Sequence, residues 1–322
     1  MTLSFSLDKS IPIIEDFEKA CEIAQAYQKP LVLLFLGSDP CCTSREFVCN
    51  VLENKEFIRN CCQDFLFVRV NFPELQHPSS HLWEENHKLK KKFQVASLPT
   101  MILLDSQGEE VTKFAYFPCS GKDYARHLRY LFREYKKLLR YIESSHFSTA
   151  TSHELKSLYF RSRDLRCTLL MQKILQEGAM RKEDLFFLVE LYSNLSNSGK
   201  KESEDAKKIR NTIQKKDPFD SQGALLRLAL LDFQEEVSKE EGDPKVAIQP
   251  VINYLDSPFS ERNKEVWRIY RMTAEYLFNH DLAESSLQIL NRGKKYFPGE
   301  SLVEVEQFER VVKDYLLSDR VK

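Results

Sequence analysis

The four residues Cys41-Cys42-Thr43-Ser44 hold the residue types best suited to nucleophilic chemistry in this chain. They follow an apolar run at 31–36 and a turn at 37–40, and a helical pattern begins directly after them. This order predicts a thiol at a helix N-terminus, where unpaired backbone N–H groups and the helix dipole favour an anion. A cysteine so placed can lose its proton near neutral pH and become a nucleophile. The usual redox pair is Cys-x-x-Cys, and here Ser44 takes the second position.

The composition is that of a globular protein of about two domains. The chain has 322 residues, 42% apolar and 30% charged, and a net charge of −1, so no global field favours nucleic acid or a membrane. No apolar run is long enough to span a bilayer, and the first eight residues lack a secretory pattern. We therefore expect a cytoplasmic protein, although a mature form without its signal would look similar. The eight cysteines include two adjacent pairs, which does not suit a disulfide framework.

The chain divides into two parts with different secondary-structure patterns. Residues 1–145 alternate between strands and helices, which predicts an α/β sheet with helices on both faces. The expected strands are 31–36, 65–70, 101–105 and 110–116, and the expected helices are 15–28, 41–52, 56–61, 82–93 and 124–142.

Residues 146–322 carry helical patterns throughout, which predicts an all-α domain. The expected helices are 154–178, 182–195, 202–215, 223–236, 244–255, 261–278, 283–297 and 302–317. Helical hairpins start near 183, 222 and 262, a period of about 40 residues that is typical of helical solenoids. Small residues at Ala274, Ser286 and Gly293 mark where two helices would approach closely. The alternative is a plain helical bundle.

The first part resembles the thioredoxin superfamily over about residues 12–140. Residues 29–35 are similar to the strand before the redox loop, residues 37–44 to the loop itself, and Leu98-Pro99-Thr100 to the segment with the family's cis-proline. The Gly-Ser-Asp start of the loop is most similar to bacterial thioredoxin-like proteins described as disulfide isomerases. The second part resembles a degenerate tetratricopeptide array. The resemblance implies a thioredoxin-like fold, and it implies that Pro99 lies beside Cys41 and aligns the substrate peptide.

Three residues depart from the family pattern. Pro40 replaces the aromatic residue before the first cysteine, Ser44 replaces the second cysteine, and Phe35 stands where the family's buried acid would fall. Release of substrate by a dithiol needs a second thiol, which Ser44 cannot supply. Ser44 can instead donate a hydrogen bond to a Cys41 thiolate and lower its pKa. The predicted catalytic residues are therefore Cys41, Ser44 and Pro99.

The other cysteines and histidines have plainer interpretations. Cys42 is an accessory candidate that would need a strained adjacent disulfide, and Cys41 itself is either reactive or vestigial. We expect Cys21 and Cys49 to pack in the core. Cys61-Cys62 lack the spacing of a zinc site, and His77, His81 and His87 are more consistent with surface residues than with a metal patch. No cofactor or metal is predicted.

Two basic tracts lie at 88–92 and 126–140. They suit a solvated helix face better than a nucleic-acid or acidic-partner surface, because the net charge is near zero and no nucleic-acid-binding motif accompanies them. Trp267 and Tyr270 are core residues or line a groove.

These observations support two alternative functions. The first is a monothiol thiol–disulfide oxidoreductase or isomerase acting on protein or peptide substrates, with a helical domain that binds substrate or a protein partner. The second is a non-catalytic chaperone-like or scaffold protein, similar in architecture to chaperedoxins, which hold unfolded clients. Neither involves nucleic acid or a membrane.

Overall fold

The computed structural model describes residues 13–37, 42–72, 81–181, 184–239 and 242–319. Cys41 and His77 lie outside these ranges. The chain divides into two compact units, 1–177 and 178–322. The predicted division at 145/146 falls inside the first unit, after the last strand. The first helices of the all-α part pack against the sheet domain, as the 3.2 Å ion pair of Arg161 with Glu134 illustrates.

The first unit is built on a five-stranded sheet in the order β1-β3-β2-β4-β5. The strands are β1 (Ile13–Ile14), β2 (Leu31–Gly37), β3 (Leu66–Phe72), β4 (Thr100–Leu104) and β5 (Glu110–Ala115). β2 pairs in parallel with β3 and antiparallel with β4, and β5 forms the edge hairpin with β4. The four predicted strands are confirmed.

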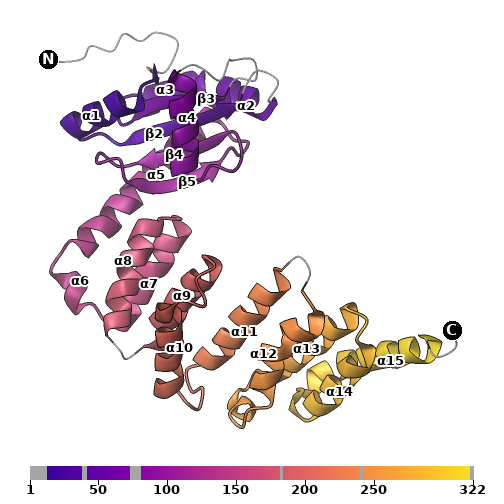
Figure 1. Ribbon diagram of the computed structural model, residues 1–322. Coiled ribbons are helices and arrows are strands. Elements are labelled where there is room, and N and C mark those ends of the chain that lie inside the picture. The colour runs from indigo at the N-terminus through magenta and orange to yellow at the C-terminus, as the bar shows by residue number, and fades with distance from the viewer. Residues whose placement is uncertain (1–12, 38–41, 73–80, 182–183, 240–241, 320–322) are drawn as a thin grey trace. The chain divides into compact units, whose positions relative to one another are not determined.

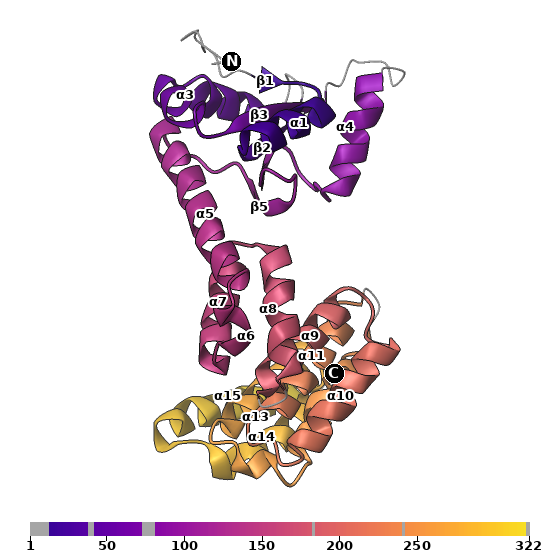
Figure 2. The same cartoon turned by 90° about the vertical axis from the view of Figure 1, so that its left-hand side faces the viewer.

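Helices cover both faces of this sheet, and Figure 2 shows α4 on the side opposite α3 and α5. The helices are α1 (Phe17–Tyr27), α2 (Cys42–Phe47), the π-helix η1 (Val48–Leu52), α3 (Lys55–Cys61), α4 (His81–Lys92), α5 (Gly121–Ile142), α6 (His146–Thr149), α7 (Ser152–Asp164) and α8 (Thr168–Met180). Alternate residues of β2 face opposite sides. Leu33 and Phe35 pack with Ala20 and Ala24 of α1, and both faces of the strand are buried.

The helix predicted at 154–178 is wrong, because two helices occupy this range. α7 ends at Asp164 with Leu165 as its C-cap, Arg166 adopts a left-handed conformation with φ of 55°, and the Cys167 N–H donates to the Ser162 carbonyl at 2.9 Å. A left-handed residue after the last helical turn is a common helix stop. Glycine usually takes that position, so an arginine there gives no warning in the sequence.

The second unit consists of helical hairpins followed by a long helix (Figure 1). Its elements are α9 (Leu185–Asn197), α10 (Glu204–Lys216), α11 (Ala224–Val237), α12 (Pro244–Leu255), the 3-10 turns η2 (Ser260–Arg262) and η3 (Lys294–Tyr296), α13 (Val266–Asn279), α14 (Ala283–Gly293) and α15 (Gly299–Asp319). The hairpins α9–α10, α11–α12 and α13–α14 start at 185, 224 and 266, close to the predicted period. Their assignment to tetratricopeptide repeats stays a prediction.

Small residues allow α13 and α14 to approach closely, as predicted. The Ser286 hydroxyl is fully buried and donates to the Ala274 carbonyl at 2.7 Å. A Cβ atom on Gly293 would lie 2.6 Å from Cβ of Tyr270. Tyr270 is itself buried, so the core interpretation holds for it, while Trp267 is half-buried against Phe297.

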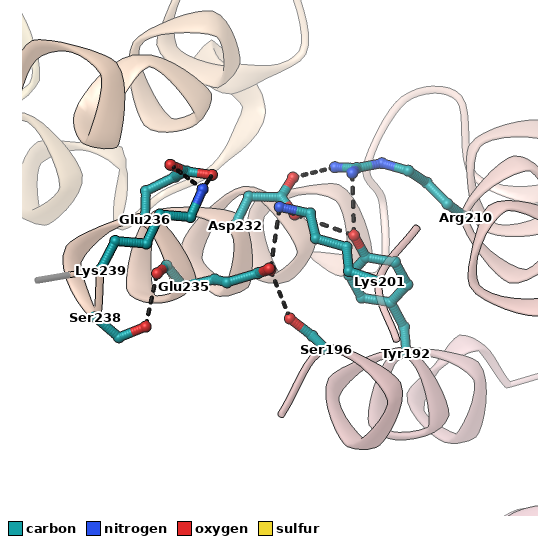
Figure 3. A network of polar contacts seen from close by, with 9 residues as sticks. All are labelled: Tyr192, Ser196, Lys201, Arg210, Asp232, Glu235, Glu236, Ser238 and Lys239. Carbon is teal, nitrogen blue, oxygen red and sulfur yellow. Dashed lines mark hydrogen bonds and ion pairs between the residues drawn. The ribbon is translucent and has the colours of Figure 1, made fainter. Parts of the chain in front are cut away.

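A buried polar network connects α9, α10 and α11 with the loop that holds Lys201 (Figure 3). Asp232 is 6% exposed and accepts hydrogen bonds from the Tyr192 hydroxyl at 3.0 Å and from Arg210. Lys201 bridges Asp232 and Glu235 at 3.1 Å each. Burial disfavours the Asp232 carboxylate, but Arg210 and Lys201 outweigh it and hold the pKa of Asp232 below its ordinary value.

Gly293→Ala tests the close packing of α13 and α14. We expect it to destabilise the protein by about 1–3 kcal/mol, because the added methyl overlaps the root of the Tyr270 side chain. Gly299→Ala is the matched control, since a methyl group added there, at the start of α15, would have no neighbour within 4 Å. Urea unfolding followed by circular dichroism measures both, and equal midpoints for the two variants would contradict the packing argument.

Asp232→Asn tests the polar network. It removes the charged partner of the half-buried Arg210 and leaves Lys201 paired with Glu235 alone, so we expect a loss of about 1–3 kcal/mol at pH 7. The control Asp256→Asn breaks an exposed pair with Arg292 and costs about 1 kcal/mol or less.

The stabilisation that the Asp232 carboxylate provides decreases as the pH falls. Because folding lowers the pKa of Asp232, its contribution is complete above the unfolded value of about 3.9 and is lost as the pH falls through the folded value. The stability gap between wild type and Asp232→Asn therefore narrows below about pH 4. A gap that stays constant down to acid unfolding would show that the carboxylate charge is not what stabilises the network.

Candidate functional site

Ser44 joins the end of the central strand to the helix that follows the cysteines. Its side chain is buried, with 3% of the residue exposed, and its Oγ accepts a hydrogen bond from the Gly37 N–H at 2.9 Å. Gly37 is the last residue of β2 and Ser44 lies in the first turn of α2. The serine therefore connects the two ends of the loop that contains Cys41. Its hydroxyl proton has no acceptor among the described residues, so it remains able to donate.

Pro99 lies at the same end of the sheet as Gly37 and Ser44. The antiparallel register pairs Phe35 with Thr100, so one step further along the ladder Pro99 falls opposite Leu36, next to Gly37. The Leu98–Pro99 peptide bond is cis, as the resemblance implied, and Pro99 is buried. The sheet register thus brings Pro99 and the Ser44 helix to one place, although 55 residues separate them in the sequence.

An aromatic cluster adjoins Pro99 and was not predicted from the sequence. The Tyr116 N–H donates to the Pro99 carbonyl at 3.4 Å, and the Tyr116 hydroxyl donates to Glu46 of α2 at 3.2 Å. The Tyr116 ring lies 5.4 Å from that of the buried Phe47. Tyr116 therefore bridges the proline segment and the cysteine helix. The signal available in the sequence was the aromatic pair Tyr116-Phe117, which is followed by a proline and comes directly after the edge strand β5.

Phe117 extends this cluster to the surface. It is 37% exposed and stacks on Tyr124 with 4.6 Å between ring centroids. The Phe117 N–H donates to the Tyr124 hydroxyl at 3.3 Å, which fixes the segment after β5 against α5. Burial raises the pKa of Tyr124, so its hydroxyl stays neutral at physiological pH. The cluster offers a partly exposed aromatic surface to an incoming peptide.

Phe35 occupies the position at which the resemblance places a buried acid. It is fully buried, lies 6.3 Å from the ring of Phe72 in a stacked arrangement, and meets Phe93 edge-on at 6.5 Å. A phenyl ring cannot take or give a proton. Phe35 therefore cannot perform the proton transfer that the resemblance assigns to this position.

The described cysteines other than Cys42 are free thiols, and most are held in the protonated form. Burial raises the pKa of Cys61 to about 12 and that of Cys167 to about 11. Burial is also the largest cause of the raised pKa values of Cys21, Cys62 and Cys119. Because the thiolate is the nucleophile, these five cysteines are poor ones at neutral pH.

The prediction that Cys49 packs in the core is wrong, because Cys49 is exposed. The buried residues of this helical segment are Ser44, Phe47, Val51 and Leu52, and Cys49 lies on its exposed side. Cys21 is half-buried against the core of the sheet face covered by α1, in agreement with its prediction.

The structure describes two of the three predicted catalytic residues, Ser44 and Pro99, and brings them to one edge of the sheet. Cys42 is the first residue of α2. His87 is exposed and packs on Trp83 with 3.7 Å between ring centroids. Within the described residues, no three His, Cys, Asp or Glu side chains lie close enough to hold a metal ion, and no helix is long and apolar enough to cross a bilayer.

Comparisons with known proteins agree with this geometry. A family model described as a thioredoxin-like domain matches residues 17–131. The thioredoxin-related protein DsbJ of Chlamydia pneumoniae is 29% identical over 282 residues, which are 85% of this chain and 79% of that protein. The disulfide bond reductase DsbH of the same organism is 26% identical over 110 residues, 34% of this chain and 66% of that protein.

Two solved structures are similar at low overall score. A DsbH oxidoreductase covers 41% of this chain and 93% of its own, with 21% identity and a TM-score of 0.37. A thioredoxin from Thermus thermophilus covers 38% of this chain and 88% of its own, with 18% identity and a TM-score of 0.31.

The match to DsbJ continues beyond the sheet domain into the helical part, since it covers 85% of the chain. The family model, the sheet order and the cis-proline segment all concern the amino-terminal part. The amino-terminal part of this chain is therefore a thioredoxin-like domain, and a long helical region follows it.

Proposed function

We propose that this chain is a thiol–disulfide exchange protein of the monothiol type, with Cys41 as the attacking thiolate. The observation that carries the proposal is the state of the Ser44 hydroxyl. It lies in the first turn of α2, three residues after Cys41 in the sequence. It accepts from the Gly37 N–H, and its own proton has no acceptor among the described residues. A hydroxyl that donates to a thiolate lowers the pKa of the thiol. The names of the relatives, a thioredoxin-related protein and a disulfide bond reductase, support the reaction class.

The reaction proceeds by two exchanges that leave the number of disulfides unchanged. The Cys41 thiolate attacks one sulfur of a substrate disulfide, forming a mixed disulfide and releasing the other substrate sulfur as a thiolate. A second substrate thiolate then attacks the substrate sulfur of the mixed disulfide, forming a new substrate disulfide and releasing Cys41. No net oxidation occurs, so a single enzyme thiol is sufficient for isomerisation. Reduction needs two glutathione molecules. The first attacks the Cys41 sulfur of the mixed disulfide and releases the substrate as a dithiol, and the second then frees Cys41 and leaves as oxidised glutathione.

Pro99 and Tyr116 are the residues we expect to hold the substrate. Both lie at the edge of the sheet where β2 ends, and their backbones already pair through the 3.4 Å hydrogen bond. The exposed ring of Phe117 provides apolar contact area for side chains of an unfolded or partly folded protein.

The helical unit has a cavity that suits the proposed binding of substrate or partner. Its volume is about 480 Å³, and helices α10, α11 and α12 contribute to its lining. Leu225, Leu228 and Phe259 supply apolar surface, while Arg210 and Asp232, which pair with each other, supply polar groups. A cavity that combines apolar surface with a few polar groups is typical of recognition sites.

Isomerisation of scrambled ribonuclease with glutathione present tests the proposal. We expect the wild type to accelerate recovery of activity and Cys41→Ala to abolish the acceleration, while Cys49→Ala retains it because Cys49 is an exposed residue five positions beyond Ser44. If Cys41→Ala is as active as the wild type, the catalytic proposal fails. Suppression of citrate synthase aggregation that survives Cys41→Ala, without any isomerisation, would establish the chaperone-like alternative.

Ser44→Cys tests the monothiol assignment. It creates a Cys-x-x-Cys pair, which allows the second thiol to release a trapped substrate. We expect reduction of insulin by dithiothreitol to be accelerated about tenfold or more relative to the wild type, since the mixed disulfide no longer waits for an external thiol. Ser44→Ala is the control and should not show this gain. An insulin reduction rate that is unchanged in Ser44→Cys would contradict a functional thiol at position 41.

A further inference from the structure

A groove on the first unit combines cationic side chains with an aromatic floor. Its volume is about 490 Å³, and it lies between α5 and the segments that lead into β2 and β3. The cations that line it are Lys29, Arg129, Arg133, Lys136, Lys137 and Arg140. Asp64 is the single acidic residue of the lining. The groove therefore has a strong excess of positive charge.

This groove is separate from the candidate catalytic edge. Lys29 and Pro30 precede β2 and Phe65 precedes β3, so the groove adjoins the amino-terminal ends of these strands. Ser44 binds Gly37 at the other end of β2. The seven residues of the strand place the two sites about 20 Å apart.

Part of this charge has no carboxylate partner in the part of the chain that the structure describes. Arg129 pairs with Asp64 at 2.6 Å, and Lys137 pairs with Glu134 at 2.8 Å. Lys29, Lys136 and Arg140 have no ion pair with any carboxylate of the described ranges, and Lys136 and Arg140 are exposed. Cations gathered without counter-charges repel one another, and an anionic ligand removes that repulsion.

The floor of the groove is apolar. Phe65 is 2% exposed and meets Phe132 edge-on, with 6.0 Å between ring centroids. The Lys136 ammonium lies 4.6 Å from the centre of the Phe132 ring, which holds it at the groove. Pro30 completes the floor. A ligand for this groove therefore carries both carboxylates and apolar groups.

The dimensions suit a short stretch of extended polypeptide. From Arg129 to Arg140 the helix rises about 17 Å, which corresponds to about five residues of extended chain. Arginine forks recognise carboxylates through paired hydrogen bonds. Nucleic acid fits less well, because the aromatic rings of the lining leave no open face on which a base could stack. Phe65 is buried, and the Lys136 ammonium lies over the Phe132 ring.

We propose that this groove docks an acidic segment of a partner or substrate protein, in extended form, along α5. It would hold the partner at a distance from the end of the sheet where Ser44 and Pro99 lie. The groove does not depend on the redox activity of Cys41, so its test is a binding measurement.

Fluorescence anisotropy with a labelled peptide, Glu-Glu-Leu-Glu-Glu-Leu, tests the proposal on the full chain. The groove variant is Arg133→Glu/Lys136→Glu/Arg140→Glu. The matched control, Lys88→Glu/Lys91→Glu/Lys173→Glu, makes the same change in net charge at exposed lysines elsewhere on the unit. We expect the groove variant to weaken binding about tenfold or more and the control to change it about twofold or less. If the charge-reversed variant does not fold, Lys136→Gln/Arg140→Gln serves in its place.

Two further probes separate the alternatives. The peptide Gln-Gln-Leu-Gln-Gln-Leu should not bind, because it lacks the carboxylates. A short poly-dT oligonucleotide should bind more weakly than the acidic peptide. The proposal is overturned if no acidic peptide binds, if groove and control variants bind it equally, or if the oligonucleotide binds more tightly.

Discussion

Burial of β2 on both faces is the constraint on which the first unit depends. Residues 31–36 are at most 4% exposed, and the strand is paired along its length with β3 on one side and β4 on the other. A slip by one residue would move each side chain into the close-packed surroundings of the opposite face, where its shape does not fit, so packing fixes the register. That register determines where Gly37 ends the strand and where Pro99 lies beside it. The position of the candidate site therefore follows from the packing of apolar side chains that take no part in chemistry.

The chemistry of the site is set by two substitutions within this frame. Ser44 keeps the hydrogen bond that ties α2 to Gly37, but it cannot form a disulfide. Phe35 completes the aromatic packing with Phe72 and Phe93, but it cannot transfer a proton. Both residues contribute to the packing of the domain, but neither can take part in a dithiol reaction cycle. The reaction that we propose for this site is exchange through a single thiolate, in which the substrate or glutathione supplies the second thiol.

Strong local patterns allowed much of this structure to be predicted from the sequence. The apolar runs predicted the four strands, and the small residues predicted the close approach of α13 and α14. The predictions failed where a local choice depends on the whole fold. The left-handed Arg166 divides one predicted helix, and Cys49 faces solvent because Ser44, Phe47 and Val51 define the buried side of its helix. Tyr116 joins the site only through pairing between distant segments, and the groove along α5 needs three segments that the sequence does not bring together.

The most direct test of the account is the pH dependence of Cys41 alkylation by iodoacetamide, with Cys49 of the same chain as the exposed reference thiol. Peptide mass mapping resolves the two sites, and Ser44→Ala removes the hydroxyl. The account predicts that Cys41 titrates well below the free-cysteine value of about 8.5 and that Ser44→Ala moves it upward. A Cys41 that titrates near that value, or is unaffected by Ser44→Ala, would contradict the account and leave partner binding as the role of the chain.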